Sequence, residues 1–151
     1  MYAFVSIIYG NTNYYLEALV LGKTLNKYTK YEKYLLYSND VPKFQLDLLK
    51  KYFILKNIKD IKIQQDNIIN KKWKYVFNKF YAFTFINYEK ICVIDIDMLI
   101  IKNIDNIFNW KTPSIMFYHH DLINCHQIKP DPKYYNNEQV FNSGLILVQK
   151  Q

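Results

Sequence analysis

The stretch KICVIDID, residues 90–97, decides the fold, because an apolar run leads directly into two aspartates. Such a continuous apolar run is typical of a strand buried on both faces of a parallel sheet. Asp95 and Asp97 are two positions apart, so on an extended chain both carboxylates point to the same side. Carboxylate oxygens suit Mg²⁺ or Mn²⁺, which also bind phosphate oxygens. The stretch therefore predicts a strand with a two-carboxylate metal site at its carboxyl end.

Taken alone, the same stretch has two other interpretations. It fits a pair of surface acids that cap a turn. It also fits the Asp-x-Asp of phosphatases of the haloacid dehalogenase type, in which the first aspartate is the nucleophile. In that family the motif lies near the N-terminus, whereas Asp95 lies two-thirds of the way along this chain, and Met98 replaces the usual threonine. The order of the motifs argues against a phosphatase.

Apolar runs and helical patterns alternate along the rest of the chain. The first strand is expected over residues 2–9, ending at the turn pair Gly10-Asn11, and Thr12 or Asn13 then caps a helix that runs to about residue 28. Further strands are expected over 33–37, 53–55, 61–63, 114–118 and 141–149, with helices from Pro42 and over 73–85, a short helical turn at 104–108, and a long loop over 119–139. This alternation predicts one α/β domain, a Rossmann-like three-layer sandwich with a mostly parallel sheet and with ligand at the carboxyl ends of the strands.

The spacing of apolar residues also predicts which face of each helix meets the sheet. Long apolar side chains gain most when they are removed from water, so the richest apolar stripe is expected to point inward. The predicted inward faces are Leu16, Leu19, Val20 and Leu25 in the first helix, Phe44, Leu48 and Leu49 in the second, and Val76, Phe80 and Phe83 in the third.

The composition of the chain limits which partners and cofactors are expected. All 20 basic residues are lysines, and they are scattered without a nucleic-acid-binding motif despite the formal net charge of +7, so no nucleic-acid partner is expected. Because arginine is absent, a metal or lysine must neutralise any bound phosphate. Cys92 and Cys125 form no metal or redox motif, which fits a reducing compartment, and Cys92 is expected to be buried in its strand.

The location that these features favour is the cytoplasm. No apolar run approaches the about 20 residues that a membrane span needs. The first residues lack the basic region and cleavage site of a signal peptide. The many lysine, asparagine, isoleucine and tyrosine residues indicate an AT-rich coding bias, which suits a large DNA virus or an AT-rich microbe.

A second polar constellation is FNSG, residues 141–144, at the start of the last expected strand. Asn142 and Ser143 offer hydrogen bonds to a ligand, and Gly144 lets the backbone pass close to one. A β-bulge or an ordinary strand start would explain the same residues without a ligand.

Three blocks together resemble glycosyltransferase family 8, the glycogenin-like and galactinol-synthase-like enzymes. The first block runs over residues 3–22, with Gly10, Tyr14 and Gly22 in place; the second runs over residues 78–108 and includes the Asp-x-Asp; the third is residues 141–144. They occur in the family's order and cover most of the chain. The resemblance implies a GT-A-type fold and a metal-dependent, retaining transfer of a hexose from a UDP-sugar, with glucose or galactose favoured, to a glycan, protein or polyol acceptor that the sequence does not name.

The resemblance also implies a role for individual residues. Uridine would meet the backbone at Ile7 and Ile8 and the ring of Tyr14, although Tyr14 also fits as an ordinary residue of an amphipathic helix. The donor would contact Lys79 and the Ile96 backbone, Asp95 and Asp97 would bind Mn²⁺ or Mg²⁺, and Asn142 and Ser143 would line the donor sugar. The catalytic set implied is Asp97, Asn142 and Ser143.

The chain departs from the family after the third block. There the family core continues with an Asp-Gln pair and a His-x-x-Gly-x-x-Lys-Pro segment, whose histidine completes the metal site, whereas this sequence runs only to Gln151. His119, His120 and His126 precede the third block, so none matches that ligand. Two expectations follow: a C-terminally truncated domain that binds UDP or a UDP-sugar, or another partner, without catalysis, and a transferase that completes its site by self-association as a homodimer or with another chain.

Overall fold

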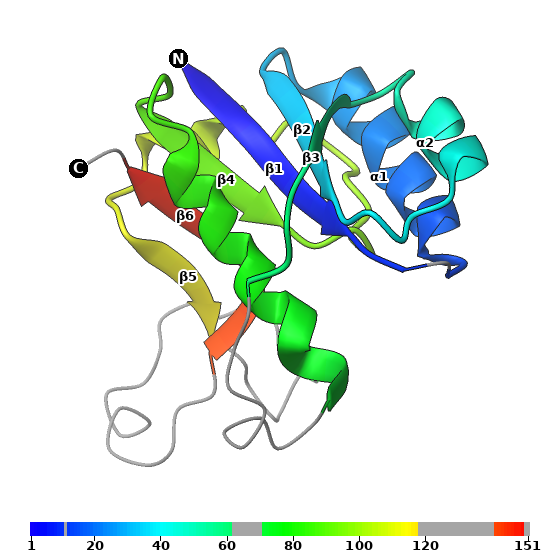
Figure 1. Cartoon of the computed structure of the whole chain (residues 1–151). Helices are drawn as coiled ribbons and strands as arrows, with labels where there is room; N and C mark the ends of the chain where they lie inside the picture. The colour runs from blue at the N-terminus through cyan, green and yellow to red at the C-terminus, as the bar shows by residue number, and fades with distance from the viewer. Residues whose placement is uncertain (11, 62–70, 118–140, 150–151) are drawn as a thin grey trace, which may run out of the picture.

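The computed structural model describes residues 1–10, 12–61, 71–117 and 141–149 (Figure 1). Its strands form one sheet in the order β3-β2-β1-β4-β6-β5. The strands are β1 (Tyr2–Ile8), β2 (Glu32–Tyr37), β3 (Ile54–Asn57), β4 (Lys90–Ile94), β5 (Ser114–Phe117) and β6 (Phe141–Gln149). β1 pairs in parallel with β2 and β4, and β2 with β3, while β6 runs antiparallel to β4 and β5. The prediction of an α/β fold with a mostly parallel sheet is confirmed.

Two layers of helix cover the sheet, because β1 is apolar on both of its faces. Figure 1 shows the 3₁₀ helix η2 (Lys71–Thr84), in green, crossing one face, with α1 (Tyr14–Tyr28) and α2 (Lys43–Leu49) on the other. Phe4 and Ile8 of β1 belong to the core under α1. Ala3 and Val5 belong to the core under η2. Successive side chains of a strand point to opposite faces, so one strand serves both cores.

The inward face of α1 is only partly the predicted one. Leu25 is buried and Leu19 packs against the core, as predicted, but Leu16 and Val20 are exposed, and Ala18, Leu21 and Gly22 are buried as well. Gly22 faces inward where α1 packs closely against Tyr52 and Phe53, just before β3. In α2, likewise, Leu49 is buried as predicted together with Gln45, but Phe44 and Leu48 are exposed.

The helix expected over residues 73–85 is present as η2, but its inward face is not the predicted one, and Val76 is partly exposed. Phe80 and Phe83 are exposed, and Ala82 and Phe85 are the residues that pack on the sheet. A 3₁₀ helix has about 3.0 residues per turn, so residues three apart are aligned in rows, and the inward face differs from that of an α-helix. Asn78 is also buried, donating from Nδ2 to Asp60 Oδ1 at 2.9 Å.

Several other predictions from the sequence can be compared with the structure. The strands predicted over 90–94 and 141–149 have those bounds, and Cys92 is a free, buried cysteine. His119, His120, Cys125 and His126, most of the strand expected over 61–63, and the loop expected over 119–139 lie outside the described residues. In the described part of the chain, no helix combines the length and the apolar character that crossing a membrane requires.

The closeness of α1 to β3 yields a stability prediction. A Cβ at Gly22 would lie 2.5 Å from Phe53 Cε2 and 2.7 Å from Tyr52 Cβ. We expect Gly22→Ala to lower the free energy of unfolding by about 1–3 kcal/mol, as overpacking does, although alanine favours a helix by about 1 kcal/mol over glycine. Urea unfolding measures the change. The exposed neighbour Lys23→Ala serves as the control, and a stabilised Gly22→Ala would contradict the close packing.

Candidate functional site

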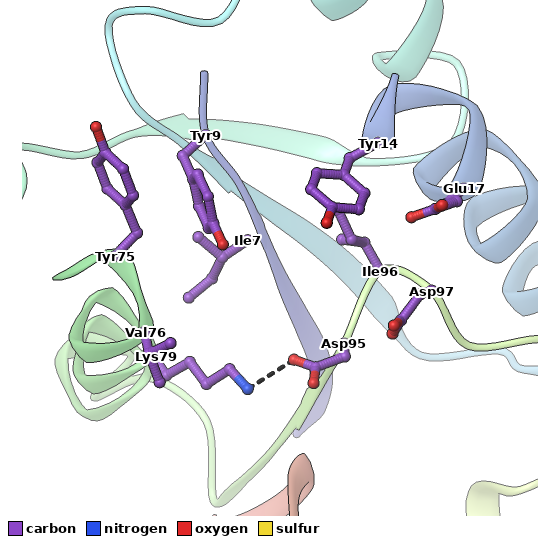
Figure 2. Close-up of a pocket in the computed structure, with 10 residues that line it drawn as sticks. All are labelled: Ile7, Tyr9, Tyr14, Glu17, Tyr75, Val76, Lys79, Asp95, Ile96 and Asp97. Carbon is purple, nitrogen blue, oxygen red and sulfur yellow. Dashed lines mark ion pairs between the residues drawn. The ribbon is translucent and has the colours of Figure 1, made fainter. Parts of the chain in front are cut away.

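A cavity of about 220 Å³ opens where β1 and β4 end. These strands are parallel neighbours, with Val5 opposite Val93, so their carboxyl ends lie at one edge of the sheet. Figure 2 shows side chains from both strand ends, from α1 and from η2 around this space. The lining residues are Ile7, Tyr9, Tyr14, Glu17, Tyr75, Val76, Lys79, Asp95, Ile96 and Asp97.

Strand alternation decides which of the two predicted β1 residues reaches the cavity. Ile7 is half-buried, points to the η2 side and lines the cavity. Ile8 points to the α1 side, where its side chain is buried in the core. Its carbonyl oxygen accepts a 3.4 Å hydrogen bond from the backbone N of Ser38. The Ile8 side chain therefore belongs to the core and not to the cavity.

Asp95 continues the alternation of β4 onto the η2 side, where it meets Lys79. Lys79 Nζ lies 2.6 Å from Asp95 Oδ1, and the two side chains are only 14% and 36% exposed. A charge-assisted contact this short and this shielded fixes both groups more firmly than a surface ion pair would be fixed. The backbone of Asp95 is also held in place, because Asp95 N donates to Gly144 O at 2.9 Å. The buried Ser6 Oγ donates to the preceding Ile94 O at 2.8 Å.

Aromatic rings form two sides of the cavity. Tyr9 and Tyr75 are stacked, with ring centroids 4.4 Å apart and planes at 17°. Tyr14 begins α1, and Figure 2 shows its hydroxyl turned toward the cavity. The backbone N of Tyr14 donates to Thr12 Oγ1 at 3.4 Å, while Asn13 makes no side-chain cap bond. Burial raises the pKa of Tyr9, and the nearby Tyr14, Asp95 and Tyr75 raise it further, so the Tyr9 hydroxyl stays neutral and protonated at physiological pH.

The carboxylates of the cavity set its charge. Glu17, Asp95 and Asp97 contribute three negative charges and Lys79 one positive charge, a formal balance of −2. Figure 2 shows Asp95 and Asp97 reaching into the space between η2 and α1. Among the described residues, no group of three acidic, histidine or cysteine side chains is arranged to hold a metal ion. Two carboxylates alone still fit Mg²⁺ or a similar cation, which is commonly held by one or two carboxylates and by substrate phosphates.

The third predicted block enters from β6, on the other side of β4. Asn142 pairs in register with Met116 and Ile146 with Ile115, so the ladder shifts between those two residues of β5. This bulged stretch includes Gly144, whose carbonyl oxygen accepts the hydrogen bond from Asp95. Bulges occur often beside active sites. The side chains of Asn142 and Ser143 lie outside the described residues.

Four lining residues were not predicted from the sequence: Tyr9, Glu17, Tyr75 and Val76. Tyr9 is the last residue of the strand predicted over residues 2–9 and directly follows β1 in the structure, so its position at the carboxyl end of the strand was a usable signal. Tyr75 carried no such signal in the sequence, because its partner Tyr9 lies 66 positions away and only the packing of η2 brings the two rings together.

Two curated proteins are similar in sequence, and no protein-family model matches the chain. An uncharacterised protein of Acanthamoeba polyphaga mimivirus is 34% identical over 154 residues, which cover 98% of this chain and 55% of the relative. An uncharacterised protein of Schizosaccharomyces pombe is 49% identical over 41 residues, covering 27% of this chain and 11% of that protein. The chain thus spans about half the length of the mimivirus relative.

Solved structures of similar fold are glycosyltransferases. The galactosyltransferase LgtC, solved with donor and acceptor sugar analogues, matches with a TM-score of 0.64 at 12% identity, over 97% of this chain and 57% of its own. The bifunctional glycosyltransferase WbbM matches with a TM-score of 0.58 at 13% identity, over 97% and 31%. GlyE of Streptococcus pneumoniae TIGR4 matches with a TM-score of 0.54 at 16% identity, over 97% and 33%. The described chain therefore has the GT-A fold of these glycosyltransferases.

Proposed function

We propose that this chain binds a UDP-sugar together with Mn²⁺ or Mg²⁺, and that it forms the donor-binding part of a retaining glycosyltransferase of family 8. The observation that carries the proposal is the convergence of Tyr14, Lys79, Asp95 and Asp97 on one cavity at the carboxyl ends of β1 and β4. In open α/β sheets this edge is where ligands bind. The glycosyltransferase fold of the solved neighbours supports a nucleotide-sugar as that ligand.

The charge of the cavity supports a metal-dependent donor site. A diphosphate is itself anionic, so the formal charge of −2 in the lining would repel it unless a cation intervened. A divalent cation on Asp95 and Asp97 would offset both sets of charges and act as a Lewis acid toward the UDP leaving group. Lys79 holds Asp95 in place at 2.6 Å and brings a further positive charge to the same wall.

The remaining parts of the donor have partners of suitable chemistry. The exposed ring of Tyr14 at the start of α1 offers a flat face to uracil, and the backbone at Ile7 and Ile8, at the end of β1, is proposed to meet the uridine. Asn142 and Ser143 lie in the bulged start of β6, just before the Gly144 carbonyl that accepts from Asp95 N, and they are proposed to line the donor sugar. The Ile96 backbone is proposed to lie near the ribose.

A front-face substitution fits this site better than a covalent intermediate. Asp95 is held by Lys79, and Asp97 is assigned to the metal, so neither aspartate is available as a nucleophile. Glu17, the third lining carboxylate, comes from α1 on the side of Tyr14, where the base and not the sugar is proposed to bind. In the proposed step the bond between the anomeric carbon and the UDP oxygen breaks while the acceptor hydroxyl oxygen bonds to the same face of that carbon. The hydroxyl proton passes to the departing diphosphate. The acceptor is a glycan, a protein or a polyol.

The second candidate function is donor binding without transfer. It is favoured by the 2.6 Å contact between Lys79 and Asp95, which engages one of the two carboxylates proposed to bind the metal. Both candidates use the same cavity, so a binding measurement tests the site and a transfer measurement separates the two functions.

Metal-dependent binding of UDP is the first prediction of this subsection. We expect calorimetry to detect UDP binding with Mn²⁺ and to lose it when EDTA removes the metal, because the carboxylates then repel the diphosphate. Asp97→Ala should weaken binding at least about tenfold, equal to about 1.4 kcal/mol. Asp47→Ala, an exposed acid of α2, is the matched control. Equal affinity with and without metal would refute the proposed role of the aspartates.

Base stacking on Tyr14 can be tested separately from phosphate binding. Stacking of a base on an aromatic ring contributes about 1–3 kcal/mol, so Tyr14→Ala should weaken UDP binding by that amount and leave pyrophosphate binding unchanged. Leu16→Ala, an exposed residue of the same helix, is the control. A parallel loss for UDP and pyrophosphate would instead indicate that the variant disturbs the phosphate site.

Transfer itself is measured with radiolabelled UDP-glucose and UDP-galactose in the presence of Mn²⁺. We expect transfer or slow hydrolysis that Asp97→Ala abolishes, since that variant removes a proposed metal ligand. If no UDP-sugar yields product while UDP still binds, the chain is the non-catalytic donor-binding domain of the second candidate.

A further inference from the structure

A row of apolar side chains on η2 faces solvent. Phe77, Phe80 and Phe83 are spaced by three, and their neighbouring ring centroids are 6.1 and 6.2 Å apart. Phe80, Phe83 and the following Ile86 are 57%, 59% and 63% exposed. The 3₁₀ geometry aligns residues three apart, so these side chains form one continuous strip. Large contiguous apolar patches are uncommon on the surface of a monomer and mark sites of interaction.

The strip continues into a groove of about 170 Å³ beside the sheet. Phe83 and Ile86 belong to both, so the strip and the groove form a single apolar surface. Most of the groove is apolar, and its residues come from the last turn of η2, the segment that follows it, the start of β4 and the end of β6. The lining residues are Ala82, Phe83, Phe85, Ile86, Tyr88, Ile91, Val148 and Gln149. Strip and groove together are referred to below as the η2 surface.

The end of β6 lies in this groove. Gln149 is the last residue of β6 and one of the lining residues. Figure 1 shows the C-terminal end of β6 next to the start of β4 and beside η2. The last described residue, Gln149, therefore lies in the same groove as exposed Phe83 and Ile86. The mimivirus relative carries 45% of its length outside the 55% that this chain matches.

We propose that the η2 surface binds a helix from the portion of polypeptide that the mimivirus relative has outside the matched region. A helix with apolar residues three and four apart fits an elongated apolar groove of this kind. The formal net charge of +7 on residues 1–151 favours a helix that carries a net negative charge, and it disfavours a second copy of this chain through mutual repulsion. The helix is either joined to this chain or supplied by another polypeptide.

The experiment uses the portion of the mimivirus relative outside the match in two arms. In one arm it is co-expressed with the tagged chain as a separate polypeptide, and in the other it is fused after Gln151. In the first arm we expect the two polypeptides to co-purify. In the fusion we expect slower hydrogen exchange at residues 80–86, and at least about fivefold less binding of an apolar-surface dye, than in the chain alone. Co-purification of the separate polypeptides shows that the helix can act in trans. Slower exchange in the fusion alone shows that it must be joined.

The double variant Phe80→Lys/Phe83→Lys should reduce co-purification at least about tenfold, because it places charges in the contact. Leu99→Lys/Ile101→Lys is the matched control, since both side chains are exposed and apolar but lie elsewhere. If the lysine variant unfolds, hydrogen exchange at residues 80–86 in the wild-type fusion still tests whether the η2 surface is covered. Failure of both arms, or equal binding by the lysine variant, overturns the proposal. The proposal is also overturned if the chain alone forms a dimer that the lysine variant dissociates, because a second copy of the chain then occupies the η2 surface.

Discussion

The parallel pairing of β1 with β4 is the constraint on which the rest of the structure depends. β1 is buried on both faces, with Phe4 in the core under α1 and Val5 in the core under η2. Its register with β4 brings the ends of the two strands to the same edge of the sheet. The positions of Ile7 and Asp95 at the candidate site follow from that register. A shift by one residue would exchange the two faces and move Ile7 into the core.

The site is organised around a carboxylate that is already partly neutralised. Asp95 is contacted by Lys79 from η2, and its backbone is held by Gly144 of β6. Elements far apart in the sequence thus fix one side chain, while Asp97 remains exposed two residues later. This arrangement keeps one acid in place and leaves the other accessible, and it underlies the proposal that an anion binds in the cavity together with a cation.

Helix η2 links the core, the site and the surface, because 3₁₀ geometry sorts its side chains into rows. One row packs Ala82 and Phe85 on the sheet and presents Lys79 to the cavity. A neighbouring row carries Phe80 and Phe83 into solvent. A disturbance of the packing of η2 is therefore expected to reach the Lys79–Asp95 contact as well as the exposed strip.

The sequence by itself determined the strands and the direction of the carboxylates. The bounds of β4 and β6 were predictable because apolar runs and alternation are local properties, and Asp95 and Asp97 line one cavity as their spacing required. Tertiary structure alone decided which faces of the helices point inward. Leu16 of α1 and Phe80 of η2 lie in rich apolar stripes and yet face solvent. The rotation of a helix depends on what it packs against, and that information lies in distant segments.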